Sequence, residues 1–154
     1  MKKIIIENLR IPSHLYIKKT NNSYSLFSKI VIKKDEIVFI NYIMMIDNDT
    51  EISSIIDDES FTFNKNHFIA REQYNEFVYF DSFINHSCDP NTSQSYVDID
   101  VYKMTALKDI EPDTELTMDY TIGYYQNFTK VDYLKHISFQ CNCKSKNCKI
   151  FIQA

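Results

Sequence analysis

Hydrophobic residues along the chain occur in short runs separated by polar segments, a pattern typical of short β-strands. The longest apolar run, at residues 36–46, predicts a buried strand. Residues 96–107 contain the clearest alternation. Val97, Ile99 and Val101 would face one side of a strand and the aspartates between them the other, so one face is solvated at its start. Further short strands are predicted at residues 15–17, 24–27, 61–70, 76–80 and 115–120.

Helical patterns are scarce in comparison. Residues 130–136 form the best helix candidate, and it is short. Residues 47–60 are polar and acidic, which predicts an insertion on the surface. Many short strands with little helix predict one domain with a mainly β fold, built from several small sheets.

Composition and charge narrow the classes of function. The 154 residues are 44% hydrophobic, which suffices for a core, and the net charge of −4 disfavours direct binding to nucleic acid. The apolar run after the first two lysines is shorter than a secretory signal requires, and no run approaches the roughly 20 residues of a membrane helix. We therefore expect a soluble, intracellular protein without a membrane partner, in which thiols stay reduced.

Three of the four cysteines lie close together near the C-terminus. Cys141, Cys143 and Cys148 follow a C-x-C-x4-C spacing within a polar segment, one ligand short of a closed tetrahedral zinc site. Cys88, far upstream, is the one cysteine left to complete it. Spacing alone leaves three alternatives open: reduced structural cysteines, a pair of disulfides, or His86 as the fourth ligand.

Three segments together resemble the SET-domain family of protein lysine methyltransferases. Residues 83–91, FINHSCDPN, are similar to the family's N-H-S-C-x-P-N segment. Residues 115–120, ELTMDY, are similar to its E-L-T-F/Y-D-Y segment, and residues 139–148 to its post-SET tail. The three occur in the family's order, and the resemblance extends over about residues 15–152.

This resemblance implies both a fold and a metal. The fold is one of small curved antiparallel sheets around a threaded, knot-like core, where the NHSC and DY segments lie side by side. Residues 1–138 would form the SET domain, including the insertion, and residues 139–154 the zinc-binding tail. In the family, the three tail cysteines bind zinc with the cysteine of the NHSC segment, here Cys88.

The implied activity is methyl transfer from S-adenosylmethionine to the side chain of a lysine in a protein. Tyr120 matches the family's catalytic tyrosine, whose hydroxyl orients the attack; without the motif it would be read as one of eleven tyrosines in a core or at an edge. The substrate would expose a lysine, as a basic or histone-like peptide does. The sequence does not indicate which protein that is.

The resemblance also implies a set of cofactor contacts. The side chain of Asn85 would bind the amino-acid part of the cofactor, and the backbone at His86 would hold the adenine edge. A polar corner that caps neighbouring loops is the other reading of these two residues. Phe151 would cover the adenine from the tail.

The lysine channel is matched less closely. Tyr42 corresponds to a tyrosine that lines it, although Met44 and Met45 replace the family's following Gly-Glu, and a core aromatic is an equal alternative. Met118 stands where the family has Phe or Tyr. Because Met is flexible and donates no hydrogen bond, a channel that admits more than one methyl group is expected.

The family's G-x-G cofactor motif is replaced by Ser23-Tyr24-Ser25, and these three residues are the expected cofactor contacts. A serine would be strained wherever the family's glycine needs a positive φ. Asp35 and Asp113 also stand at turn positions where the family favours glycine, and Gly123 is the single glycine in the chain. Because the loss of glycine is chain-wide, an adapted site is favoured over an inactive SET-like peptide-binding module, which remains the alternative.

Overall fold

The computed structural model describes most of the chain. The described residues are 2–6, 11–21, 23–42, 50–56, 59–62, 83–98, 101–121, 138–149 and 151–153. In these segments the secondary structure is twelve short β-strands without an α-helix, which confirms the predicted mainly β fold. The described part accordingly contains no helix that could cross a membrane. The predicted helix at 130–136 and strand at 76–80 lie outside the described residues, as does most of the predicted strand at 61–70.

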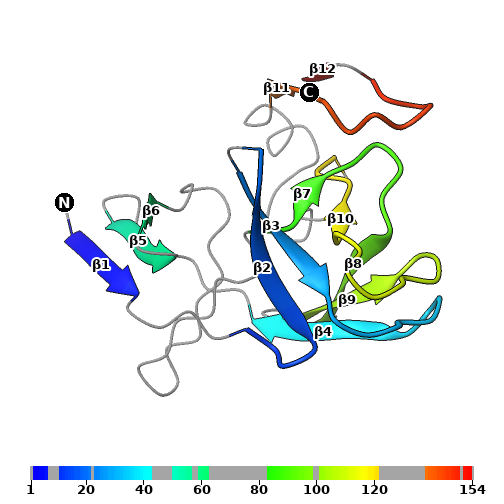
Figure 1. The fold of residues 1–154 in the computed structure, drawn as a ribbon, viewed down its shortest axis with the longest axis horizontal. Helices are drawn as coiled ribbons and strands as arrows, with labels where there is room; N and C mark the ends of the chain where they lie inside the picture. Colours follow the sequence, from blue (N-terminus) through cyan, green and yellow to red (C-terminus); the bar gives the residue numbers. More distant parts are fainter. Residues whose placement is uncertain are drawn as a thin grey trace.

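Two antiparallel sheets form the centre of the molecule (Figure 1). In the first, strands β4 (Ile37–Tyr42) and β8 (Thr92–Asp98) flank β9 (Val101–Ala106). The second is a hairpin of β2 (Leu15–Thr20) and β3 (Ser23–Ser28). Small antiparallel sheets are what the SET-domain resemblance implied.

Three further sheets are smaller or less regular. β5 (Thr50–Ile56) pairs with β1 (Lys2–Ile6) in parallel and with β6 (Glu59–Thr62) in antiparallel orientation. Two strands therefore form within or next to the range predicted to be a surface insertion. β7 (Asn85–His86) and β10 (Thr117–Met118) also pair in parallel. The antiparallel prediction thus holds for most pairings, and these two are the exceptions.

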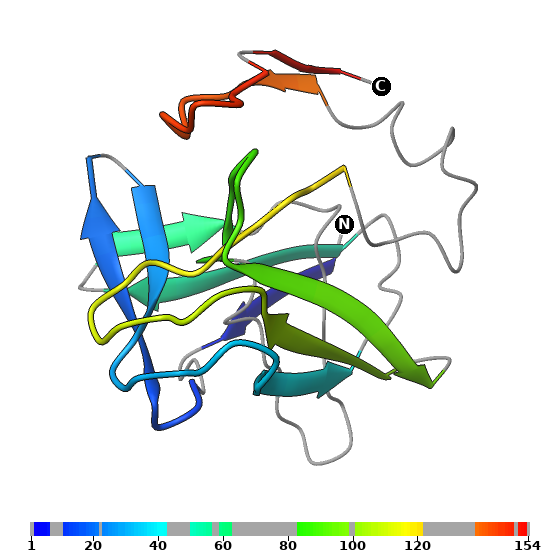
Figure 2. The ribbon, with the colours of Figure 1, turned by 90° about the vertical axis from the view of Figure 1, so that its right-hand side faces the viewer.

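The last described segment returns to the body of the molecule. β11 (Ser138–Gln140) pairs with β12 (Phe151–Gln153), so the cysteine-rich residues between them form a closed loop. Figure 2 shows this segment, in orange to red, across one end of the molecule and facing the green segment that carries β7. The tail is therefore held next to the NHSC motif.

The predicted strand at residues 96–107 is wrong in its extent. β8 ends at Asp98 and β9 begins at Val101, and the two strands are antiparallel, so the chain reverses where one continuous strand was expected. A register shift follows Tyr96, and Val97 is 58% exposed rather than turned toward the core. The alternation in sequence came from two strands whose two connecting residues, Ile99 and Asp100, include neither Gly nor Pro.

The hydrophobic core joins the two central sheets to both motif segments. Leu26 of β3 and Leu116, just before β10, are fully buried. β3 is buried on both faces along residues 24–26, because one face packs on the core and the other meets the NHSC segment. A side chain at position 25 must therefore be small, and serine meets that requirement. The core cluster comprises Leu15, Tyr24, Leu26, Ile32, Val38, Phe39, Phe83, Ile84, Tyr102, Met104, Ala106, Ile110, Leu116 and Met118.

The two motif segments lie side by side, as the resemblance predicted. The amide nitrogen of Asn91 donates to the carbonyl of Glu115 at 2.8 Å, and its amide oxygen accepts from the backbone N–H of Thr117 at 2.9 Å. The Thr92 hydroxyl donates to the carbonyl of Thr117 at 2.7 Å. Side chains following the NHSC motif thus satisfy the backbone of a strand too short to pair along its whole length.

Backbone conformation resolves the question raised by the missing glycines. Asp35 (φ 70°) and Asp113 (φ 61°) are left-handed, which confirms that both occupy positions suited to glycine. Ser23 and Ser25 are absent from the described residues with positive φ and lie in the extended strand β3. The replacement of both motif glycines by serine therefore introduces no left-handed strain.

The left-handed conformation of Asp35 predicts that a glycine variant at this position is more stable than an alanine variant. Asp35→Ala should lower the free energy of unfolding by about 1 kcal/mol relative to Asp35→Gly, because alanine resists this conformation and glycine does not. Urea unfolding of the two variants measures the difference. At the neighbouring exposed Lys34, which is not left-handed, the alanine variant should be the more stable of the pair. The same order at both positions would contradict the assignment.

Candidate functional site

The four cysteines come together in one cluster. The sulfurs of Cys88, Cys141, Cys143 and Cys148 all lie within 4.8 Å of one another, and none of the four is joined in a disulfide. The Cys88 and Cys141 sulfurs are 3.8 Å apart. In a tetrahedral site with Zn–S bonds of about 2.3 Å, neighbouring sulfurs lie about 3.8 Å apart. The donor set and its spacing therefore fit one zinc ion. The structure brings Cys88 together with the three tail cysteines, and metal binding by the four stays a prediction.

Local backbone contacts hold this cluster in place. The Cys143 sulfur accepts from the backbone N–H of Cys88 at 3.5 Å, and the Cys88 sulfur accepts from that of Lys149 at 3.5 Å. Lys144, between the second and third tail cysteines, is left-handed (φ 57°). Both hydrogen bonds join the tail to the NHSC segment, so the cluster is shared between two distant parts of the chain.

The thiols differ in their acidity. Burial raises the pKa of Cys88 and raises the pKa of Cys141 to about 12. Hydrogen bonding to Ser145 and to the backbone of Cys88 lowers the pKa of Cys143 to about 5. Because metal ligation requires thiolates, a metal entering this site would displace protons from the thiols of Cys88 and Cys141.

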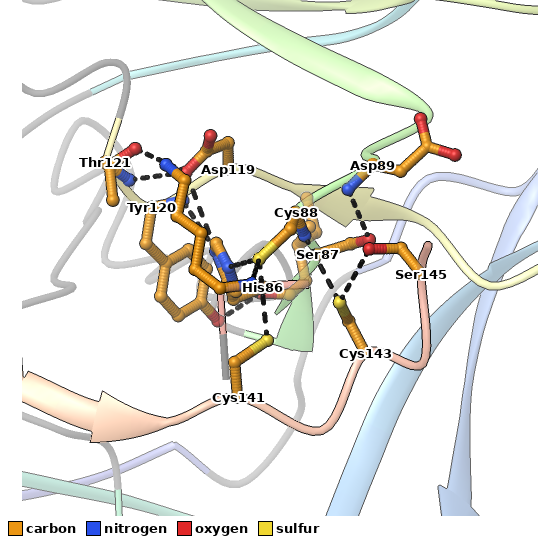
Figure 3. Close-up of polar contacts among 12 residues, drawn as sticks. His86, Ser87, Cys88, Asp89, Asp119, Tyr120, Thr121, Cys141, Cys143 and Ser145 are labelled. Carbon is orange, nitrogen blue, oxygen red and sulfur yellow. Dashed lines mark hydrogen bonds and ion pairs between the residues drawn. The ribbon is translucent and has the colours of Figure 1, made fainter. Parts of the chain in front are cut away.

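Tyr120 lies beside the four-cysteine cluster. Figure 3 shows His86 between Tyr120 and Cys88, with Cys141 and Cys143 approaching from the C-terminal segment. The rings of His86, Tyr120 and Phe139 pack with centroids 5.2 to 5.8 Å apart. Phe139 precedes Cys141 by two residues, so the tail contributes both a sulfur and a ring to this region.

The hydroxyl of Tyr120 is held as a neutral phenol. It donates a hydrogen bond of 2.6 Å to the backbone carbonyl of Ile84. Burial, reinforced by the negative charge of Glu115, raises the pKa of Tyr120 to about 12. At neutral pH this residue can therefore orient a partner through its hydroxyl but cannot act as a phenolate base.

A chain of polar side chains links β3 to both motifs. The amide nitrogen of Asn85 donates to the Ser25 hydroxyl and to Oε1 of Glu115, each at 2.8 Å. The Ser25 hydroxyl also lies 3.0 Å from that of Thr20. Both amide hydrogens of Asn85 are thereby used, which leaves its carbonyl oxygen as the group with which it can bind a ligand. That oxygen is an acceptor and suits an ammonium group.

The remaining predicted site residues fall into three groups. Ser23 is exposed at the start of β3, with its hydroxyl 3.5 Å from the carbonyl of Tyr24. Tyr24 and Met118 are buried in the core, at 7% and 4% exposure. The side chains of Tyr42 and Phe151 lie outside the described residues.

Two contributors to this site were missed by sequence reasoning. Glu115 belongs to the ELTMDY motif, but a glutamate beside a short strand is normally solvated, and only its contact with Asn85 shows otherwise. The contribution of the Phe139 ring was missed for a similar reason, because the residues that it contacts, His86 and Tyr120, are remote in sequence. In both cases the presence of the residue in a motif was the one available signal.

Comparison with known proteins agrees with this arrangement. A protein from Plasmodium falciparum (isolate 3D7), "Variant-silencing SET domain-containing protein", is 32% identical over 150 residues, which cover 87% of this chain and 5% of that protein. The human "Histone-lysine N-methyltransferase SETMAR" is 40% identical over 80 residues, which cover 46% of this chain and 11% of that protein. The chain therefore spans a small fraction of the length of either relative.

The family model describes the region in which the site lies. It is the model of the SET domain, and it matches residues 23–121. This range holds β3, the NHSC segment and Tyr120, which are the parts that the structure brings together. With the match covering more than half of its length, the chain belongs to the SET-domain family.

Proposed function

We propose that the chain is a protein-lysine methyltransferase that uses S-adenosylmethionine and carries a structural zinc ion. The observation that supports this most directly is the convergence of Ser25, Asn85 and Glu115 in one hydrogen-bonded group, with Glu115 close enough to Tyr120 to raise its pKa. These residues come from three segments of the chain. One relative is described as a SET domain-containing protein and the other as a histone-lysine N-methyltransferase, which agrees with the proposal.

The residues present suit the chemistry of the cofactor. S-adenosylmethionine, when bound, supplies a methyl group on a positively charged sulfonium and also carries an ammonium group. The carbonyl oxygen of Asn85 is the acceptor proposed for the ammonium. The carboxylate of Glu115, bonded to Asn85, supplies negative charge close by. The strand at Ser23 and Ser25 is extended, so the strain that would have favoured an inactive module is missing at these two described residues.

Tyr120 is proposed to orient the attacking amine rather than to deprotonate it. Its pKa of about 12 keeps the phenol protonated, and the carbonyl of Ile84 fixes the direction of its hydroxyl. A free lysine side chain has a pKa of about 10.4 and must lose its proton before it attacks. Removal of that amine from water favours its neutral form. The neutral amine must also be aligned with the methyl group, and Tyr120 is proposed to provide this alignment.

Zinc is proposed to bind Cys88, Cys141, Cys143 and Cys148, and its role there is structural. Four thiolates complete the coordination of a tetrahedral ion and leave no position for a reacting water. Binding would convert metal affinity into stability of the tail and of its contacts with β7. A protein substrate with an exposed lysine is the proposed partner, and the net charge of −4 suits a basic peptide.

Tyr120→Phe tests the proposed role of the phenol. Loss of one positioned hydroxyl should reduce methylation of a panel of basic proteins by about 100-fold or more. The rise in melting temperature caused by millimolar S-adenosylmethionine should persist, because the hydroxyl is not needed to hold the cofactor. Tyr16→Phe, which removes an exposed hydroxyl bonded to Asp113, is the matched control and should leave methylation intact. Wild-type protein that shows neither thermal shift nor methylation would favour the inactive binding module.

Glu115→Gln tests the proposed electrostatic contribution. Glutamine can still accept the hydrogen bond from Asn85, so the substitution mainly removes the negative charge. We expect the dissociation constant for S-adenosylmethionine to rise by about 10-fold, or about 1.4 kcal/mol, when measured by calorimetry. Glu111→Gln removes the same charge from an exposed position and should have little effect. Equal affinities in the two variants would contradict a role for Glu115.

A further inference from the structure

The side chain of His86 lies between Tyr120 and the four-cysteine cluster and contacts both. The family resemblance implies a role for its backbone, and the cysteine spacing alone left its side chain as an alternative metal ligand. In the structure the imidazole is 3% exposed, although it belongs to the polar NHSC motif. One ring nitrogen faces Tyr120 and the other faces Cys88. The orientation of this buried ring is therefore fixed by a contact at each of its two nitrogens.

The hydrogen bonds determine which ring nitrogen carries the proton. The backbone N–H of Tyr120 donates to Nδ1 of His86 at 3.1 Å, so Nδ1 must be the unprotonated nitrogen. The proton of the neutral ring is then on Nε2, which lies 3.4 Å from the sulfur of Cys88. His86 therefore donates an N–H···S hydrogen bond to a sulfur of the four-cysteine cluster.

The other groups that face this ring do not compete for its nitrogens. Oδ1 of Asp119 is 3.8 Å from Nδ1, beyond hydrogen-bond distance, and it accepts from the backbone and the hydroxyl of Thr121 at 2.9 and 2.7 Å. Phe139 meets the imidazole edge-on with centroids 5.2 Å apart. The two hydrogen bonds are thus the polar contacts that set the position of the ring.

We propose that His86 is a positioning residue that couples metal occupancy of the four-cysteine cluster to the placement of Tyr120. A metal ion fixes the sulfur of Cys88, the N–H···S bond fixes the imidazole, and Nδ1 holds the backbone of Tyr120. Hydrogen-bond donors to metal ligands orient those ligands and strengthen metal binding. The coupling is reciprocal, so loss of His86 weakens metal binding and loss of metal releases Tyr120. This inference rests on metal binding by the four thiols and is independent of methyl transfer.

Two conservative variants separate the two hydrogen bonds. In His86→Gln, the amide nitrogen can reach the position of Nε2 and donate to Cys88, but nothing replaces Nδ1. In His86→Asn, the amide oxygen can replace Nδ1 as acceptor for Tyr120, but nothing reaches Cys88. Zinc affinity, measured by competition with a chelator, should fall by about 10- to 100-fold in His86→Asn and less in His86→Gln.

The test is a zinc titration of the full chain labelled with ¹⁵N-tyrosine, in which the amide resonance of Tyr120 is assigned by its loss in Tyr120→Phe. Zinc should shift this resonance in the wild type, and the shift should be lost or much reduced in both His86 variants. The amide of Tyr16, on β2, is the internal control and should stay in place. Neither readout depends on catalysis.

Each contrary result has a distinct meaning. A wild-type Tyr120 resonance that does not respond to bound zinc would overturn the coupling while leaving the metal centre intact. A full response in both His86 variants would overturn the role of His86 and assign the coupling to another contact, such as Phe139. Failure of the wild type to bind zinc would overturn the metal centre and this inference together, without bearing on cofactor binding.

Discussion

The site depends on one closure, in which the sulfurs of the C-terminal segment meet that of Cys88 immediately after β7. Two segments more than 50 residues apart in the sequence meet there, and neither of them carries all four sulfurs of the cluster. The tail brings three thiols and the ring of Phe139, while the NHSC segment brings Cys88 and His86. Such a long-range contact carries a loop-closure cost, which metal ligation would offset. Tyr120 is placed by the same group of contacts, because its backbone is bonded to His86.

The polar centre of the site shows how a chain poor in glycine accommodates a fold that often uses it. Ser25 occupies a strand buried on both faces, where a small residue is required, and its hydroxyl becomes a partner of Asn85. Asp35 and Asp113 adopt left-handed conformations at turns instead of glycine. The substitutions thus follow the local demand at each position. Serine is found at position 25, where a small side chain is required, and aspartate at positions 35 and 113, where φ is positive; Asn21 and Lys144 are also left-handed.

Sequence reasoning succeeded where motifs carry specific chemistry. The cysteine spacing and the NHSC segment pointed to the four thiols that the structure brings together, although metal binding by them stays a prediction, and the turn positions of Asp35 and Asp113 were correct. It failed at residues 96–107, because an alternating pattern does not reveal a reversal that lacks Gly or Pro. The roles of Glu115 and of the His86 side chain depend on contacts between distant segments, so no local pattern could reveal them. The parallel pairing of β1 with β5 was missed for the same reason.

The most direct test of the shared thiolate centre is X-ray absorption spectroscopy at the zinc edge on purified, tag-free protein. We predict one zinc ion per chain, surrounded by four sulfur atoms at about 2.3 Å. That result requires Cys88 and the three tail cysteines together, since the chain contains four cysteines in total. A metal-free protein, or a first coordination shell that contains nitrogen or oxygen in place of any sulfur, would contradict the closure on which the whole site depends.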